Sequence, residues 1–186
     1  MGVEPKLFNW LALAKMAVLF LLAAGGANAL GQGFSFESAG ARFGAPIGES
    51  GLDFMQAEAF VDWNLPWRWD LGAQWRLDMR LELSAGWLGS GPVNAAVGTL
   101  GPSLVLQRAL FPISLESGIS PTLLSEHDLE SKNFGTPIQF TTHVAIDWDF
   151  ATHFRMVCRF QHMSNGGLSH HNPGLNLYMF GLSYRF

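Results

Sequence analysis

The chain has 186 residues, enough for one domain with a hydrophobic core, and only 14% of them are charged, which is low for a soluble globular protein. The net charge of −4, without Lys/Arg runs interleaved with aromatic residues, excludes nucleic-acid binding. The single cysteine, Cys158, excludes an internal disulfide framework, so stability must come from packing or from a membrane.

The first segment, residues 1–29, has the features of a secretory signal peptide. Lysines precede an apolar run at residues 16–24, and a small-x-small cleavage pattern ends at Ala29. The apolar run is shorter than the roughly 20 residues that a membrane-spanning helix needs, which disfavours an N-terminal membrane anchor. We therefore expect an exported domain over residues 30–186.

The rest of the chain alternates between apolar and polar residues. From Trp75 to Trp87 every odd position is apolar and almost every even position is polar, and residues 134–150 repeat this pattern. A helical period would mix the two sets, so the alternation predicts β-strands. Turn-rich breaks divide the chain into about eight strands, near residues 33–44, 52–63, 71–88, 93–107, 111–123, 134–149, 153–164 and 174–186.

The length of these strands favours a membrane protein. Several exceed ten residues, and a tilted strand needs about 9 to 11 residues to cross a bilayer. Eight is the smallest common strand number among outer-membrane barrels. We therefore predict an all-β fold, an eight-stranded antiparallel transmembrane β-barrel of the outer membrane. Alternation alone leaves a second fold open, a soluble barrel with an apolar interior.

Aromatic residues favour the membrane barrel. The last strand alternates apolar side chains up to the C-terminal Phe186, a pattern that resembles the signature by which outer-membrane barrels are recognised for assembly. Tryptophans gather near the predicted strand ends, as interfacial girdles require, although they would also suit a core. These tryptophans are Trp63, Trp67, Trp69, Trp75 and Trp87.

The segment FQHMSNGGLSHHNPGLN, residues 160–176, joins the last two predicted strands and contains a candidate catalytic pair. His162 and Ser164 continue the apolar side of their strand, and two strand residues at this spacing lie about 6.6 Å apart. Their side chains can lean together, so that the imidazole takes the hydroxyl proton. The small residues Gly166 and Gly167 allow backbone amides to approach an oxyanion. A polar strand end that runs into a turn would explain the same pattern.

Residues 162–168, HMSNGGL, followed by Asn-Pro-Gly-Leu at 172–175 and the alternating last strand, closely resemble the lipid A 3-O-deacylase family of acyloxyacyl hydrolases. The Glu116-x-Gly118 and Asn-Phe-Gly (133–135) segments are also similar to the family. The resemblance implies a serine esterase on the lipid-facing exterior of an eight-stranded barrel in the cell outer membrane. Its reaction would remove the ester-linked acyl chain at position 3 of lipid A.

The resemblance also implies roles for single residues. Ser164 would be the nucleophile and His162 the general base. The oxyanion donors would be three consecutive residues, Asn165, Gly166 and Gly167. The third position of the triad, typically Glu in the family, is Asn176 here, on the strand expected to pair with that of His162. An asparagine carbonyl can hold the imidazole N–H, but it offers no charge to the imidazolium.

Other polar residues have simpler interpretations. The clustered histidines match no standard zinc spacing, and no paired Cys or Glu accompanies them, so we expect no metal and no cofactor. His170 and His171 are expected in an exposed connection, within reach of lipid phosphates. Glu116 is expected to face the barrel interior and to pair with an arginine such as Arg155 or Arg159.

We therefore expect an outer-membrane enzyme whose partner and substrate is lipid A or lipopolysaccharide. One rival is a non-catalytic outer-membrane barrel with a structural or adhesive role, and a lipid A assay separates the two. Another rival is a soluble periplasmic carrier, which would be extracted from membranes without detergent. The sequence leaves open whether two copies form a homodimer.

Overall fold

The computed structural model describes residues 33–46, 54–90, 93–129 and 132–186. The expected signal peptide, residues 1–29, lies outside the described residues, and its cleavage stays a prediction. In the part of the chain that the structure describes, there is no helix both long and apolar enough to cross a membrane.

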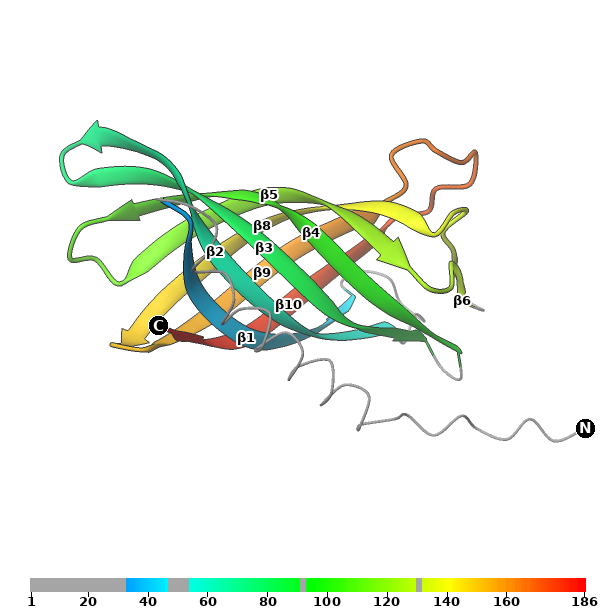
Figure 1. Cartoon of the computed structure of the whole chain (residues 1–186). Coiled ribbons are helices and arrows are strands. Elements are labelled where there is room, and N and C mark those ends of the chain that lie inside the picture. Colours follow the sequence, from blue (N-terminus) through cyan, green and yellow to red (C-terminus); the bar gives the residue numbers. More distant parts are fainter. Residues whose placement is uncertain (1–32, 47–53, 91–92, 130–131) are drawn as a thin grey trace, which may run out of the picture.

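Eight antiparallel strands of the described chain close into a barrel (Figure 1). The order around the barrel is β1-β10-β9-β8-β5-β4-β3-β2, so the first and last strands pair with each other. The barrel strands are β1 (Ser35–Pro46), β2 (Phe54–Gly72), β3 (Trp75–Ser90), β4 (Val93–Arg108), β5 (Ile113–Leu124), β8 (Ile138–Ala151), β9 (Phe154–Ser164) and β10 (Leu175–Arg185). A two-stranded sheet, β6 (Asp128–Leu129) and β7 (Lys132–Asn133), lies in the connection from β5 to β8. The predicted eight-stranded antiparallel barrel is confirmed.

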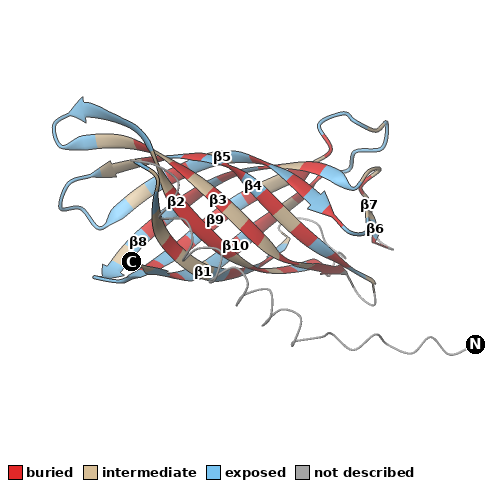
Figure 2. Cartoon of the chain, in the orientation of Figure 1, coloured by how far each residue is buried: buried red, intermediate tan, exposed pale blue. Residues whose placement is uncertain are grey.

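Side chains alternate between the barrel interior and its outer wall, and Figure 2 shows this alternation as buried and exposed bands along the strands. In β9, Arg155 and Arg159 are buried, whereas Met156 and Phe160 are exposed. Successive strand residues point to opposite faces, so charged residues fill the interior and apolar residues cover the wall. This is the reverse of the soluble barrel with an apolar interior.

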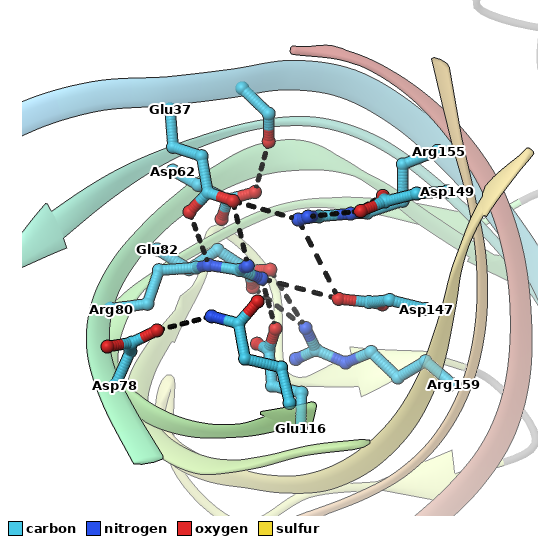
Figure 3. Close-up of polar contacts among 12 residues, drawn as sticks. Glu37, Asp62, Asp78, Arg80, Glu82, Glu116, Asp147, Asp149, Arg155 and Arg159 are labelled. Carbon is cyan, nitrogen blue, oxygen red and sulfur yellow. Dashed lines mark hydrogen bonds and ion pairs between the residues drawn. The ribbon is translucent and has the colours of Figure 1, made fainter. Parts of the chain in front are cut away.

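The middle of the barrel is filled by ion pairs (Figure 3). Arg80 contacts three carboxylates: Nε lies 3.0 Å from Glu37, and Nη1 contacts Glu116 and lies 3.4 Å from Asp147. The cavity that this network encloses has a volume of about 10 Å³, room for about one water molecule. Glu116 faces the interior as predicted, but it pairs with Arg80 rather than with the expected Arg155 or Arg159.

Strand β2 is longer than the sequence predicts. The turn-like residues 64–66 predict a strand end near residue 63, and this is wrong because β2 continues to Gly72. Pro66 lies within a register shift between β2 and β3, where its missing N–H breaks no regular ladder. The hairpin closes at Ala73 and Gln74, whose φ angles of 50° and 69° are left-handed. In Figure 1 this hairpin projects beyond its neighbours.

The connections differ between the two ends of the barrel. At one end, here called the short-turn end, hairpins close through residues 73–74, 109–112 and 152–153, and the C-terminus lies there too (Figure 1). The opposite end includes the connections 125–137 and 165–174 and is called the long-connection end. One end of the barrel therefore has short turns, and the other end has longer connections.

Aromatic rings surround the short-turn end. Their centroids lie 5.1 to 6.2 Å apart in a series of contacts that joins Trp148, Phe150, Phe154, Tyr184 and Phe186. Three of the tryptophans expected in a girdle are exposed at this end: Trp67, Trp69 and Trp75. Trp63 is instead buried, in ring contact with Phe34 and Phe36.

Candidate active site

The candidate site lies on the outer wall at the long-connection end of β9. His162 and Ser164 are the last outward positions of this strand, on the same side as the exposed Phe160, and both are partly exposed. Their neighbours Gln161 and Met163 point inward and are buried. The strand therefore turns both residues away from the interior, as the parity of the sequence predicts.

Asn176 of β10 is the register partner of His162, which confirms the predicted pairing of the two strands. The Oδ1 atom of Asn176 lies 2.8 Å from Nδ1 of His162. A carbonyl oxygen only accepts hydrogen bonds, so Nδ1 carries the proton and Nε2 keeps a lone pair. The nitrogen that can act as a base is thus the one not bonded to Asn176.

Ser164 ends β9 and is the register partner of Phe140 on β8. Its hydroxyl forms no hydrogen bond with any residue that the structure describes. Strand residues i and i+2 lie about 6.6 Å apart, which is close enough for the side chains of Ser164 and His162 to lean toward each other.

Asn165 is fully buried and ties the β9–β10 connection together. Its Nδ2 group donates to the backbone carbonyls of Phe134 at 3.0 Å and His171 at 2.8 Å. Its backbone N–H donates to Oδ1 of Asn172 at 3.0 Å. The polar groups of Asn165 that the sequence suggested as oxyanion donors are therefore bonded within the protein.

The two glycines that follow occupy left-handed backbone conformations, with φ angles of 61° for Gly166 and 86° for Gly167. The Gly167 N–H donates to Oδ1 of Asn165 at 2.9 Å. Among the described residues, no acceptor is seen for the N–H of Gly166. Gly166 is thus the member of this trio whose amide is available to a bound oxyanion.

Gly174 supports the imidazole from the β10 side. A Cβ atom at this position would lie 2.9 Å from Cε1 of His162, closer than ordinary contacts allow, and its φ angle is 63°. Lys132 of β7 donates from Nζ to the Gly174 carbonyl at 2.7 Å. Sequence reasoning missed both supporting residues, because the Asn-Pro-Gly segment predicts a turn and not what the turn contacts.

Buried apolar residues close the barrel beneath the site. Met163 and Leu175, which flank the outward site residues on the inner face, belong to a cluster with Phe134, Leu177 and Met179. Dense packing fixes the backbone on which the outward side chains are mounted. The site therefore rests on a buried, well-packed part of the barrel.

An apolar groove begins beside the site. Phe160 and Tyr178 are the next outward residues below His162 and Asn176, and their rings lie 5.3 Å apart. They line a groove of about 530 Å³ on the outer wall, together with Val144, Ile146, Leu115 and Cys158. This surface suits a hydrocarbon chain.

The remaining predicted residues lie outside the site. His170 and His171 are exposed in the β9–β10 connection, as expected. Within the described ranges, no group of three or more His, Cys, Asp or Glu residues has the arrangement of a metal site.

Known proteins resemble this chain in sequence and fold. The sequence model of the family described as lipid A 3-O-deacylase (PagL) matches residues 55–185. The lipid A deacylase PagL of Bordetella bronchiseptica is 28% identical over 100 residues, which are 49% of this chain and 56% of that protein. The match thus spans little more than half of this relative. The crystal structure of the outer membrane enzyme PagL has a TM-score of 0.68 at 21% identity, covering 78% of this chain and 97% of that one. The likeness shows a shared barrel fold.

Proposed function

Because the chain belongs to the lipid A 3-O-deacylase (PagL) family, we propose that it hydrolyses the acyl ester at position 3 of lipid A with Ser164 as nucleophile. The barrel is a protein of the outer membrane, and lipid A or lipopolysaccharide is its substrate and partner. The observation that carries this proposal is the 2.8 Å hydrogen bond from His162 to Asn176, which prepares a base two residues from Ser164 on the outer wall.

The height of the site on the barrel supports a lipid substrate. Short turns of bacterial outer-membrane barrels face the periplasm, so the long-connection end faces the exterior. His162 lies eight residues beyond Phe154 in the girdle, which at a strand tilt near 40° is about 20 Å along the membrane normal. The apolar band of such barrels is about 25 Å tall. The ester groups of lipid A in the outer leaflet lie at this level.

The reaction follows from the hydrogen bonds. Nε2 of His162 takes the proton of Ser164 while Oγ attacks the ester carbonyl, and the Gly166 N–H stabilises the resulting oxyanion. The imidazolium then protonates the oxygen of the departing sugar, which leaves an acyl-serine. Water, deprotonated by His162, releases a 3-hydroxy fatty acid and restores the serine. Asn176 holds the Nδ1 proton throughout.

In the proposed reaction, the acyl chain of lipid A would lie in the apolar groove. Its first residues, Phe160 and Tyr178, lie one step below His162 and Asn176, in the direction in which outer-leaflet chains run. A chain in this groove would place its carbonyl beside Ser164. Burial of the chain's apolar surface, worth about 25 cal/mol per Å², would hold it there.

Mass spectrometry of lipid A from cells that produce the protein tests the proposal. Wild type is expected to release one ester-linked acyl chain, and Ser164→Ala or His162→Ala is expected to lower the rate by about 10³-fold or more. Ser169→Ala, a serine of the same connection, serves as the control. Heat-dependent migration of each variant in gels checks that its barrel is folded. Undiminished release by a folded Ser164→Ala protein would exclude this serine mechanism.

A further inference from the structure

The short-turn end contains a pocket at the opposite end of the barrel from the candidate active site. It has a volume of about 480 Å³ and lies where the β2–β3 hairpin approaches the turn between β4 and β5. Its polar lining includes Gln74, Arg76, Gln107 and Arg108. These four side chains carry N–H donors, and one carboxylate, Asp70, the register partner of Arg76, also lines the pocket.

Cations outnumber anions around this pocket. The Asp78 carboxylate accepts from Nε of Arg68 and Nε of Arg76, both at 2.8 Å, and from Gln107. One carboxylate thus serves two guanidinium groups, each through a single nitrogen. Among the residues that line the pocket itself, two arginines, Arg76 and Arg108, accompany one carboxylate, the exposed Asp70. The local charge is therefore positive.

Two guanidinium groups have donors left for a ligand. In the described part of the chain, the Nη atoms of Arg76 make no hydrogen bond, and the Arg108 side chain makes neither an ion pair nor a hydrogen bond. Arginine binds phosphate through paired N–H groups, which makes a phosphate ester the fitting ligand class.

An apolar rim joins the pocket to the outer wall. Trp75, Leu110 and Phe111 line the pocket and are exposed. Trp75 is the register partner of Arg108, and the next outward pair below them is Leu77 with Leu106. Tryptophan and cationic side chains next to a leucine-covered wall are typical of the membrane interface.

We propose that this pocket binds the phosphate group of an inner-leaflet phospholipid, with Arg76 and Arg108 as donors and the acyl chains along Leu77 and Leu106. Free phosphate would satisfy the arginines but would leave the adjoining apolar rim exposed. A lipid covers both surfaces at once. The phosphate pocket shares no residue with the serine site, although Leu77 and Leu106 also line the apolar groove of the outer wall. The proposal does not depend on the proposed hydrolysis.

Native mass spectrometry of the purified full-length protein in detergent tests this site with phosphatidylglycerol as the probe. Wild type is expected to retain one lipid molecule, and Arg108→Gln is expected to weaken its retention at least fivefold. Arg76→Gln is expected to act in the same direction. Arg185→Gln removes a cation at the same end that does not line the pocket, so this variant is expected to retain phosphatidylglycerol as well as wild type.

Several outcomes would overturn the lipid site. Equal losses in Arg108→Gln and Arg185→Gln would indicate non-specific attraction to surface charge. Displacement of phosphatidylglycerol by an equal concentration of inorganic phosphate would indicate a free-anion site. Absence of a retained lipid on wild type would exclude the site, and the lipid A assay would still report on Ser164 separately.

Discussion

Asn176 stands where a carboxylate would stabilise the protonated form of His162. Its amide oxygen, 2.8 Å from Nδ1 of His162, accepts the Nδ1–H hydrogen bond but adds no negative charge. In the proposed mechanism, Asn176 would supply the orienting part of a triad without the electrostatic part. The rate of the proposed hydrolysis should therefore depend more on tautomer control than on charge.

Replacing Asn176 separates these two effects. Asn176→Leu, which removes the acceptor, is expected to lower the deacylation rate by about 10²- to 10⁴-fold. Asn176→Glu keeps an acceptor and adds charge, so the rate should rise or stay unchanged. Initial rates of acyl release from lipid A in detergent micelles provide the measurement. A severe loss in Asn176→Glu would mean that the amide has a role that the acid cannot fill.

Gly174 limits the position of the imidazole. Gly174→Ala is expected to lower the rate at least tenfold, because its Cβ would lie 2.9 Å from Cε1 of His162. Gly167→Ala is the matched control, since Gly167 also has a left-handed φ but a Cβ atom there would have no neighbouring atom within 4 Å. Rates are compared in folded proteins. Equal losses in both variants would assign the effect to backbone strain alone.

At the scale of secondary structure, the β2–β3 hairpin holds two non-glycine residues in left-handed conformations, Ala73 and Gln74. Such a conformation costs roughly 1 to 2 kcal/mol for a residue with a Cβ atom. Gln74→Gly is therefore expected to raise the free energy of unfolding by about 1 kcal/mol. Urea titration of the protein in lipid vesicles measures this. Gln74→Ala keeps the Cβ atom, so its free energy of unfolding should not rise. A lower free energy of unfolding in Gln74→Gly would show that the left-handed conformation of Gln74 is not strained.

The sequence predicted most strands because a period of two is visible within each one. It misplaced the end of β2, since Pro66 signals a break whereas a register shift absorbs it. The sheet of β6 and β7 was not predicted, because two-residue strands carry no period. The outward parity of His162 and its pairing with Asn176 follow from strand alternation. The hydrogen bond from Asn165 to the Phe134 carbonyl does not follow from strand alternation, because it joins two connections whose residues are 31 positions apart.

At the scale of the whole molecule, the ion pairs of the interior hold several strands together. Arg80 of β3 reaches Glu37 on β1, Glu116 on β5 and Asp147 on β8. Loss of one partner leaves buried charges uncompensated, which costs about 3 to 5 kcal/mol. An exposed pair costs only about 0 to 1 kcal/mol.

Arg80 on β3 and Arg68 on β2 allow a direct comparison of a buried and an exposed arginine. Arg80→Ala is expected to lower the free energy of unfolding by about 3 to 5 kcal/mol. Arg68→Ala, whose side chain is 58% exposed, should change it by about 1 kcal/mol or less. Equilibrium urea unfolding in vesicles checks both values. Similar small effects would mean that the interior pairs are structurally dispensable.

The outward mounting of His162 and Ser164 on a barrel whose interior is filled sets the kind of kinetics to expect. In the proposed reaction, lipid A would reach Ser164 by lateral diffusion within one leaflet, so turnover should follow the mole fraction of lipid A in that leaflet. Adding inert phospholipid at constant total lipid A would then slow the enzyme by surface dilution. The freed fatty acid would remain in the same monolayer and compete for the groove.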